Sequence, residues 1–316
     1  MIFFYLSFAS SLFNHQYEEK SFISWMRSTN QYYTGDEYHF RLGIFLANSH
    51  FIKEHNSKNM NFIVGLNKFA VYTPAEYKTL LGFRMPNFHN SPIKPSENKY
   101  NTDSVDWRDK GVVNEIRDQA ECGSDWAFSV IQAAESANAI SNGKLESYSE
   151  QNLVDCVSDC YGCDGGTMTT AFSYIISNQD GHFASRDEYK YKAFEGTCKF
   201  SQCTPIGSIS NYINIAAGDE DDLASKIEEY GPVSAAMDAS STSFELYIGG
   251  IYDEPSCSSQ YLDHAVGVVG FGKENITKYW IVRNSWGTSW GEFGYMRLIW
   301  NDNRCGIASM SSVPLI

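Results

Sequence analysis

The sequence predicts an α+β protein whose helices come before its strands. Residues 126–134 are apolar at almost every turn and contain no proline, so they predict a buried central helix that ends at Asn142-Gly143. Later segments rich in β-branched and aromatic residues, with glycines between them, predict strands over residues 233–238, 264–270, 279–283 and 295–300. This order indicates a domain of two lobes over residues 105–316, one helical and one β-rich.

The composition is that of an acidic globular chain. Its 316 residues carry a formal net charge of -14 and are 43% hydrophobic, which allows a substantial core. Phosphate binding needs clustered Lys and Arg, so this charge argues against nucleic acid as a partner. Residues 1–13 form an apolar run too short to span a bilayer, which predicts a signal peptide; a buried N-terminal helix turn is the alternative. No later stretch is apolar enough to predict a membrane span.

The region before residue 105 is predicted to be a helical unit followed by a linker. Large apolar side chains recur among polar ones over residues 15–56, which predicts helix. Thr73-Pro74-Ala-Glu76 predicts the capped start of a short helix. Residues 84–104 hold prolines and many polar side chains with little periodicity, which is typical of a linker. The chain therefore divides into residues 1–13, 14–83, 84–104 and 105–316.

Shorter helices are predicted inside the last of these regions. Residues 149–156 begin at a serine cap, and a Gly- and Cys-rich loop at 160–166 precedes a helix through Met168 and Phe172. Residues 219–230 have acidic side chains in the first turn and end at Gly231-Pro232, which predicts another helix.

The cysteines are confined to the later part of the chain. All 8 follow residue 120, and an even number clustered in one region indicates disulfides formed in an oxidising compartment. Cys160 and Cys163 have a spacing that zinc ligands also show. No second pair with suitably spaced histidines follows, so the zinc reading is disfavoured.

Residues 119–129 (QAECGSDWAFS) form a loop that runs into the central helix. Unpaired backbone N–H groups and the helix dipole favour an anion at such a position. The stretch resembles the C-G-[SA]-C-[WY] signature of papain-like cysteine proteases, except that Asp125 stands where the family has its nucleophilic cysteine. The motifs LDHAVGVVGFG around His264 and RNSWGTSWGE around Asn284 also resemble that family.

The helical region before the linker resembles the propeptide of cathepsin L-like members. The residues that match the E-x3-R-x3-F-x2-N-x3-I-x3-N motif lie on one helix face: Glu37, Arg41, Phe45, Asn48, Ile52 and Asn56. Periodicity alone would indicate only an amphipathic helix. Residues 65–71 (GLNKFAV) resemble the G-x-N-x-F-x-D motif, with Val71 in place of the aspartate, a position linked in the family to acid-triggered processing.

This resemblance implies a papain-like fold with a helical left lobe and a β-barrel-like right lobe over residues 105–316. It implies that residues 14–83 are an inhibitory propeptide, which we call the prosegment. Residues 84–104 would cover the cleft in the reverse direction and be cut during maturation.

The resemblance also implies the catalytic roles. Cysteine-protease chemistry needs a thiolate, an imidazole, a group that orients the imidazole, and donors for the oxyanion. His264 would be the imidazole and Asn284 would orient it, while Trp286 shields their hydrogen bond from water. Gln119 would donate to the oxyanion together with the backbone N–H of Asp125.

The substrate cleft is assigned on the same basis. Gly165-Gly166 would be the backbone edge that pairs with an extended peptide. The pocket for the second residue before the scissile bond would accept bulky hydrophobic side chains and be lined by Met168, Ala236, Leu262 and Met310. On the residues alone, each of these would be assigned to the core.

The family's disulfide pairing carries over to six of the cysteines. It implies Cys122–Cys163, Cys156–Cys198 and Cys257–Cys305. Cys160 and Cys203 are left, and we expect them to bond to each other, although sequence alone cannot fix connectivity. Asn275-Ile-Thr277 is an N-glycosylation sequon, usable if the chain is secreted.

Asp125 changes what the site is expected to do. A carboxylate that attacked an amide would have to form a mixed anhydride, and water activation as in aspartic proteases needs a second carboxylate, for which the sequence shows no matched position. The favoured hypothesis is therefore a catalytically impaired pseudopeptidase that retains a peptide-binding cleft. The alternatives are an active endopeptidase cleaving after a bulky hydrophobic residue at the second position, a purely structural role, and a sequence error or deliberate substitution at residue 125.

The expected partners follow from this reading. They are peptide or protein substrates or ligands, the chain's own propeptide, and protein inhibitors of cysteine proteases; we expect a monomer with no cofactor and no metal. The expected location is the secretory pathway, ending outside the cell or in a lysosome-like compartment.

Overall fold

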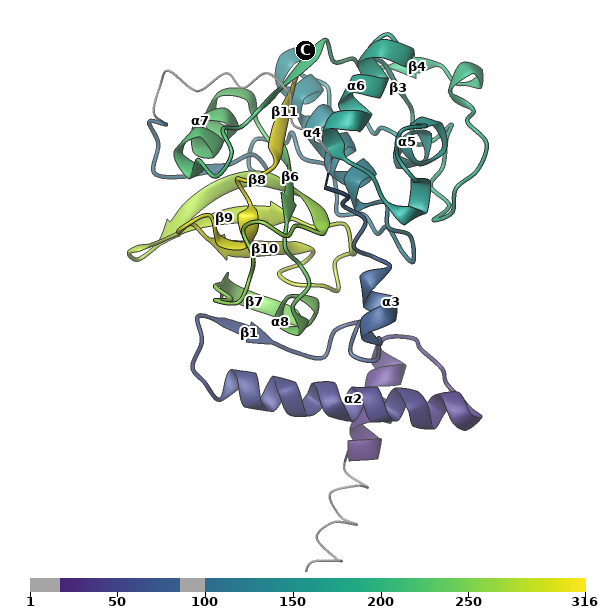
Figure 1. Cartoon of the computed structure of the whole chain (residues 1–316), viewed down its shortest axis with the longest axis vertical. Coiled ribbons are helices and arrows are strands. Elements are labelled where there is room, and N and C mark those ends of the chain that lie inside the picture. Colours follow the sequence, from purple (N-terminus) through teal and green to yellow (C-terminus); the bar gives the residue numbers. More distant parts are fainter. Residues whose placement is uncertain (1–17, 86–99) are drawn as a thin grey trace, which may run out of the picture.

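The fold places two lobes side by side above the prosegment, as the computed structural model of the chain shows (Figure 1). The structure describes residues 18–85 and 100–316. Helices α4 (Asp125–Asn142), α5 (Glu150–Cys156) and α6 (Met168–Asn178) build the helical lobe, which keeps the name left lobe although it lies on the right in Figure 1. Most strands build the other lobe, the right lobe, which lies on the left in that view. The predicted α+β class and its order are therefore confirmed. The predicted signal peptide at residues 1–13 lies outside the described residues, as does most of the linker.

Helix α4 is the central helix of the left lobe. It is buried along most of its length and packs against the apolar cluster of that lobe. It ends at Gly143, whose φ of 71° is a left-handed conformation that glycine adopts without strain. The prediction that Asn142-Gly143 ends this helix is confirmed.

Smaller elements complete the left lobe and its border. They are the 3-10 turns η1 (Gly162–Asp164) and η2 (Phe200–Gln202) and the paired short strands β3 (Phe183–Ala184) and β4 (Pro205–Ile206). Helix α7 (Glu220–Tyr230) belongs to the other lobe, because its Leu223, Ala224 and Ile227 pack in the apolar cluster of the right lobe. Asp219 caps α7 by accepting a hydrogen bond from the backbone N–H of Asp222. The predicted helix over residues 219–230 is thus confirmed, with its first residue as the cap.

The right lobe is organised by a nine-stranded sheet with the order β1-β7-β10-β9-β8-β6-β11-β5, in which β2 also pairs with β8. Its strands are β1 (Phe62–Val64), β2 (Val105–Asp106), β5 (Asn211–Asn214), β6 (Val233–Met237), β7 (Tyr247–Tyr252), β8 (His264–Glu274), β9 (Thr277–Arg283), β10 (Tyr295–Ile299) and β11 (Ser311–Leu315). Helix α8 (Thr242–Glu245) precedes β7, and the 3-10 turn η3 (Arg304–Gly306) precedes β11.

Antiparallel pairing brings two predicted site residues to the same end of two neighbouring strands. β8 begins at His264 and β9 ends at Arg283, next to Asn284. Because neighbouring antiparallel strands run in opposite directions, the first residue of β8 and the last residue of β9 lie at the same end of the strand pair. The strands β1, β2, β5, β7 and β11 of this sheet, and the separate pair β3 and β4, were not predicted from the sequence.

The prosegment forms a separate layer with its own small core. It contains a helix over residues 18–28, helix α2 (Gly35–Asn56), strand β1 and helix α3 (Pro74–Lys78). The prediction of continuous helix over residues 15–56 is wrong in its middle, since the chain turns at residues 29–34, where Asn30 has a φ of 54°. This break lets the two helices cross, so that Phe22 of the first packs against Phe45 of the second.

The motif residues of α2 hold the later part of the prosegment in place. Arg41 bonds both carboxylate oxygens of Glu76 at 2.6 and 2.5 Å and donates to the backbone oxygen of Val71 at 2.8 Å. Asn48 donates to the backbone oxygen of Ala70 at 3.0 Å. The motif face of α2 that the sequence predicted therefore binds residues 70–76, which lie later in the prosegment. Val71 itself is fully buried in the apolar cluster of the prosegment.

Helix α3 begins as predicted. Thr73 and Glu76 form a capping box, in which each side chain bonds the other's backbone N–H. The prosegment then joins the right lobe through β1, which pairs antiparallel with β7, and through Tyr77, whose hydroxyl donates to the backbone oxygen of Ala239 at 2.6 Å.

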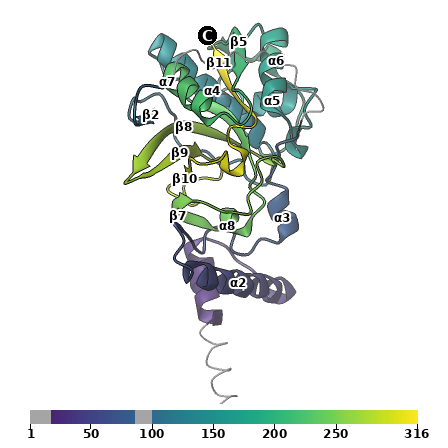
Figure 2. The same ribbon diagram turned by 60° about the vertical axis from the view of Figure 1, so that its left-hand side comes forward.

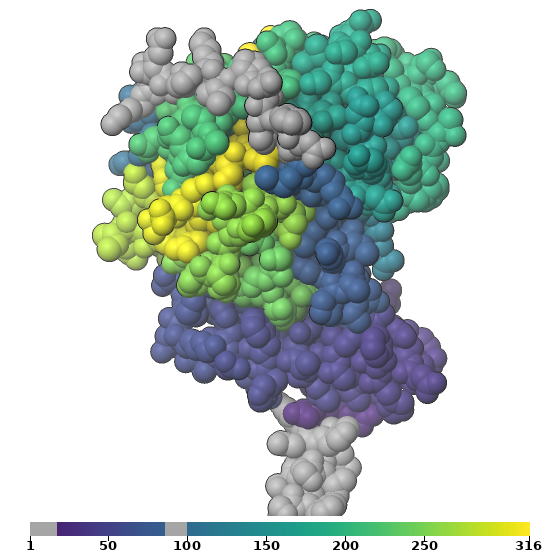
Figure 3. Space-filling model, in the orientation of Figure 1, coloured from purple at the N-terminus to yellow at the C-terminus, as the bar shows by residue number. Residues whose placement is uncertain are grey.

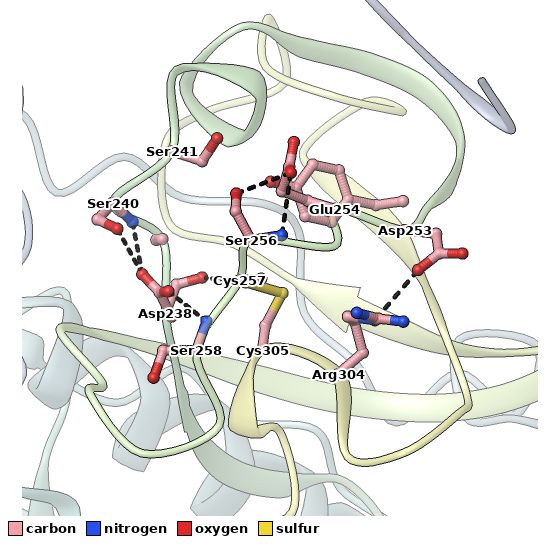
Figure 4. The surroundings of a disulfide bond; sticks show 12 residues. Asp238, Ser240, Ser241, Asp253, Glu254, Ser256, Cys257, Ser258, Arg304 and Cys305 are labelled. Atoms are coloured by element: carbon pink, nitrogen blue, oxygen red, sulfur yellow. Dashed lines mark hydrogen bonds and ion pairs between the residues drawn. A yellow bond between two sulfur atoms is a disulfide. The ribbon is translucent and has the colours of Figure 1, made fainter. Parts of the chain in front are cut away.

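The structure forms three disulfides, and their pairing is the one that the resemblance implied. They are Cys122–Cys163, Cys156–Cys198 and Cys257–Cys305. The last joins the connection between β7 and β8 to η3, beside Asp238 and Ser258 (Figure 4). Asp238 accepts hydrogen bonds from the backbone N–H groups of Ser240 and Ser258, which holds the loop around this disulfide.

The prediction of a Cys160–Cys203 disulfide is wrong. Both cysteines are free thiols. Cys160 is buried in the left-lobe core, whereas Cys203 packs in a different cluster with Cys156 and Tyr189. The two thiols therefore pack against different neighbours and not against each other.

The Arg41–Glu76 pair generates a prediction about pH. The hydrogen bonds from Arg41 lower the pKa of Glu76 from 4.5 to about 2. A lowered pKa means that the carboxylate stabilises the fold above pH 4.5 and that this contribution is lost as the pH falls toward 2. We expect Glu76→Gln to lower the thermal unfolding temperature of the full chain near neutral pH, by a free energy of about 1 kcal/mol or less because the pair is partly exposed.

The difference in unfolding temperature between wild type and Glu76→Gln should disappear as the pH is lowered to about 2. Glu54→Gln is the matched control, because Glu54 pairs with Lys58 on the exposed face of α2, and it should change the unfolding temperature little. A gap that stays constant across this pH range would contradict the role given to the Glu76 carboxylate.

Candidate active site

The loop before α4 places Asp125 at the start of the helix. Asp125 is the first residue of α4 and is fully buried. Its carboxylate therefore lies where the helix dipole and the free backbone N–H groups favour negative charge. One helical turn later, the Ser129 hydroxyl bonds the backbone oxygen of Val266 in β8 at 2.7 Å and the hydroxyl of Ser234 in β6 at 2.6 Å. These bonds fasten the helix to the right lobe on the face that carries Asp125.

Asp125, His264 and Asn284 form a continuous chain of contacts across the two lobes. Oδ2 of Asp125 lies 2.7 Å from Nδ1 of His264, and Nε2 of His264 lies 2.9 Å from Oδ1 of Asn284. Oδ1 of Asn284 also accepts the backbone N–H of Ser285 at 2.8 Å, which fixes the orientation of the amide. Nε2 of His264 therefore carries a proton that it donates to Asn284, and Nδ1 faces the carboxylate.

Aromatic side chains enclose the imidazole. His264 is fully buried and stacks on Trp286, with ring centroids 4.7 Å apart and an interplanar angle of 29°. Phe244 contacts both rings at close to a right angle. The structure thus places Trp286 against the His264–Asn284 contact, where it excludes water.

The carboxylate of Asp125 has further donors. Its Oδ2 accepts the backbone N–H of Gly82 at 2.8 Å and that of Ala265 at 3.2 Å, and its Oδ1 lies 2.6 Å from the backbone nitrogen of Trp126. Gly82 belongs to the prosegment, so the residue at the nucleophile position bonds directly to the segment that occupies the cleft. Hydrogen bonds to an ionised acceptor are the strong kind.

Gln119 is also bonded to the prosegment. Its Nε2 donates to the backbone oxygens of Leu80 and Cys122, both at 2.8 Å, and its Oε1 accepts the Ser285 hydroxyl at 2.7 Å. The side-chain donor that the resemblance assigns to the oxyanion therefore already holds a peptide carbonyl. A substrate carbonyl could use this donor only after Leu80 has left it.

Residues 79–85, which we call the cleft segment, run between the lobes. The backbone of Gly166 donates to Gly82 at 2.9 Å and accepts from Arg84 at 2.9 Å, and the N–H of Phe83 donates to the backbone oxygen of Asp263 at 3.0 Å. Gly166 is thus the edge that pairs with an extended chain. Figure 3 shows the blue surface of this part of the prosegment between the teal left lobe and the green and yellow right lobe.

Gly82 lies where no side chain fits. A Cβ atom built on Gly82 would be 1.9 Å from the backbone oxygen of Gly123 and 2.9 Å from Oδ1 of Asp125. On the other side of the cleft segment, a Cβ on Gly165 would be 2.4 Å from the backbone oxygen of Gly82. Glycines on both sides let the backbones approach closely enough to hydrogen-bond.

Phe83 is buried among residues that were predicted to line the substrate pocket. This side chain is only 4% exposed and packs in one apolar cluster with the four residues assigned to the pocket: Met168, Ala236, Leu262 and Met310. The structure therefore places the four in the same apolar cluster as this aromatic side chain. A cavity of about 130 Å³, lined partly by Met168 and Met310, remains beside the ring.

Sequence reasoning missed several residues of the site. Gly82 and Phe83 were placed in the prosegment but given no contact, although a glycine followed by a bulky apolar residue just before the linker was a usable signal. Ser129 was assigned only to the helix. Asp263 was quoted in the His264 motif without a role; burial raises its pKa to about 6, and its Oδ1 accepts the backbone N–H of Ala239 at 2.8 Å.

The part of the chain that the structure describes contains neither a candidate metal-binding cluster nor a helix suited to span a membrane. Over residues 18–85 and 100–316, no group of three or more His, Cys, Asp or Glu side chains is arranged to hold a metal ion. In the same part of the chain, none of the helices combines the length and the apolar character needed to cross a membrane.

The fold and this site define a two-lobe protein with a histidine–asparagine pair of the peptidase type and its own N-terminal region in the cleft. Comparison with known families matches residues 101–315 to the papain family cysteine proteases and residues 22–77 to the cathepsin propeptide inhibitor domain. The chain belongs to the papain family, and it is a cathepsin L-like zymogen.

Individual relatives agree with this assignment. Cysteine proteinase 3 of Dictyostelium discoideum is 41% identical over 97% of this chain and 94% of its own length. Cathepsin L1 of Drosophila melanogaster is 40% identical over 89% of this chain and 80% of its own. Among solved structures, digestive procathepsin L2 from the larval midgut of Tenebrio molitor has a TM-score of 0.88 at 36% identity and covers 95% of this chain and 100% of that one.

The close contact at Gly82 generates a prediction. We expect Gly82→Ala to push the cleft segment away from Gly123, because overpacking of this kind costs about 1–3 kcal/mol. Hydrogen exchange of the Phe83 and Arg84 amides, which bond across the cleft, should become faster.

Gly43→Ala is the matched control for this variant. Gly43 lies in α2 with no atom within 4 Å of an added Cβ, and alanine there should stabilise the helix by about 0.5–1 kcal/mol. Unchanged protection of the cleft segment in Gly82→Ala would show that the segment does not lie against Gly123.

Proposed function

We propose that this cathepsin L-like zymogen is a pseudopeptidase, in which Asp125 removes peptide-bond turnover while the cleft keeps the ability to bind peptides. The observation that carries the proposal is the carboxylate of Asp125 at the nucleophile position, 2.7 Å from His264 Nδ1. The imidazole therefore faces a carboxylate where the family's chemistry needs a thiolate.

The chemistry of the carboxylate supports loss of turnover. A thiolate that attacks an amide gives a thioester, which water can open. A carboxylate that attacked would give a mixed anhydride, whose carboxylate leaving group is much better than the amine that has to be expelled. The tetrahedral adduct would therefore return to substrate. Removing the nucleophile from a catalytic triad leaves only the residual rate supplied by binding and by the oxyanion donors.

The alternative is an active endopeptidase in which Asp125 activates water. Aspartic proteases do this with two carboxyl groups that share a proton. Asp263 is a partly buried carboxyl next to His264 in the sequence, but it accepts a hydrogen bond from the backbone N–H of Ala239 and makes none with Asp125. This arrangement favours the pseudopeptidase.

The cleft in turn has the features of a peptide-binding site. Phe83 lies in an apolar pocket, Gly166 pairs with the backbone of the cleft segment, and Gln119 holds a peptide carbonyl. A peptide of similar shape could use the same contacts once the prosegment has left. We therefore propose extended peptides with a bulky hydrophobic side chain, and protein inhibitors of cysteine proteases that bind in the same cleft, as ligands.

The prosegment is proposed to stay bound under acid conditions. Val71, at the position linked to acid-triggered processing, is a buried apolar side chain, so there is no carboxylate whose negative charge could be lost as the pH falls. Asp125 adds a hydrogen bond to Gly82. We also propose that the chain is monomeric and is delivered outside the cell or to a lysosome-like compartment; the three disulfides fit the secretory pathway.

The test of the proposed function is restoration of the nucleophile. After proteolytic removal of the residues before about position 100, Asp125→Cys should cleave a fluorogenic peptide with a bulky hydrophobic residue at the second position before the scissile bond. Its rate should exceed that of wild type by about 10³-fold or more, and an epoxide inhibitor of cysteine proteases should abolish it.

Asp125→Ala is the control without any nucleophile, and its rate should match that of wild type. Comparable rates for wild type and Asp125→Cys would support the active endopeptidase instead. Failure of Asp125→Cys, combined with no binding of the peptide to wild type, would rule out a retained cleft.

The bond between Asp125 and Gly82 gives a separate prediction for the full chain. A hydrogen bond to a charged group contributes about 1.5–3 kcal/mol, so Asp125→Ala should speed exchange of the Gly82 amide roughly 10- to 150-fold. The Gly65 amide donates to Leu246 far from Asp125 in the sequence and serves as the internal control. Equal acceleration at both amides would indicate global loosening of the prosegment and would contradict a specific role for Asp125.

A further inference from the structure

The hairpin formed by β8 and β9 has a solvent-exposed tip. β8 ends at Glu274 and β9 begins at Thr277, and these two residues are cross-strand partners, so Asn275 and Ile276 alone make the turn. Figures 1 and 2 show the hairpin reaching out from the body of the right lobe in both views.

The residues of the tip are only partly explained by the needs of the turn. Asn275 has a φ of 54°, and asparagine tolerates this left-handed conformation better than most residues. A turn gives no reason for Ile276, which is 91% exposed and is the most exposed of the large hydrophobic side chains in the described part of the chain. Tips of hairpins normally carry Gly, Asn or Asp.

The side chains of the tip are also unengaged. Over the described residues, neither the amide of Asn275 nor the hydroxyl of Thr277 takes part in a side-chain hydrogen bond, although asparagine in a turn usually bonds the local backbone. Both groups therefore stay accessible in the folded chain. Asn275-Ile-Thr277 is the single Asn-x-Ser/Thr tripeptide in the sequence.

We propose that Asn275 carries an N-linked oligosaccharide. The donor class is an oligosaccharide joined to a lipid through pyrophosphate, used by the transferase of the secretory pathway. Nδ2 of Asn275 forms a bond to C1 of the first sugar and loses one proton, the bond from C1 to the phosphate oxygen breaks, and the lipid pyrophosphate leaves with the electron pair. The threonine two residues on completes the recognised tripeptide.

The position of the tip makes this modification compatible with the rest of the structure. β8 has 11 residues, so at about 3.4 Å per residue the tip lies roughly 35 Å from His264 at the other end of the strand. A sugar chain on Asn275 covers the exposed Ile276 and leaves the cleft and the prosegment free. The three disulfides fit an oxidising compartment of the secretory pathway, where this transfer occurs. The inference does not depend on the role of Asp125.

The test uses the full chain secreted from eukaryotic cells. Peptide-N-glycosidase should increase its electrophoretic mobility and convert the glycosylated asparagine to aspartate, which peptide mass spectrometry should locate at residue 275. Thr277→Val keeps the shape and the strand preference of threonine but removes the hydroxyl, and it should abolish the glycosylated form.

Thr277→Ser is the matched variant that keeps the tripeptide, and it should retain the glycan. The rate at which an added protease removes the prosegment should be the same for Thr277→Val and wild type. A secreted, disulfide-bonded chain with unmodified Asn275 would overturn the proposal, as would a glycan that persists in Thr277→Val. Neither readout uses catalytic activity, so the result is separate from the test of the pseudopeptidase.

Discussion

The carboxylate of Asp125 is the point at which three parts of the molecule meet. It belongs to α4 of the left lobe, contacts His264 and Ala265 of the right lobe, and accepts a hydrogen bond from Gly82 of the prosegment. A buried charge is costly unless it is paired and hydrogen-bonded. The lobes and the prosegment supply these partners together. The Asp125 carboxylate therefore stabilises the arrangement in which the prosegment occupies the cleft, and it is itself stabilised by that arrangement.

The intact geometry around His264 is therefore no sign of turnover by itself. Trp286 belongs to the core of the right lobe. The hydroxyl of Ser285, which follows the end of β9, donates to Oε1 of Gln119 at 2.7 Å. These residues hold the lobes together whether or not a nucleophile is present. Substituting Ser285 by a residue without a hydroxyl would take this donor from the buried Oε1 of Gln119, at about 1–3 kcal/mol. The packing and hydrogen bonds that stabilise the fold can thus preserve the geometry of a peptidase cleft even when it has no nucleophile.

Sequence reasoning succeeded where an interaction is local or where a motif fixes it, and it failed where distant residues had to meet. The end of α4 at Gly143 and the Thr73–Glu76 capping box depend on neighbouring residues and were predicted. The Cys160–Cys203 bond was wrong because the pairing of the last two cysteines depends on which clusters enclose them. The contact of Gly82 with Asp125 spans 43 residues and left no periodic signal.

The sequence by itself determined the α+β class, the helix face that holds the prosegment, and the absence of a thiol at residue 125, because periodicity and residue identity can be read along the chain. The tertiary structure alone decided that Phe83 is buried among the predicted pocket residues, that Gln119 holds the Leu80 carbonyl, and that Asp125 binds Gly82. Each of these depends on how closely two backbones approach. That distance is set by the packing of whole lobes and by the glycines between them, which no local pattern encodes.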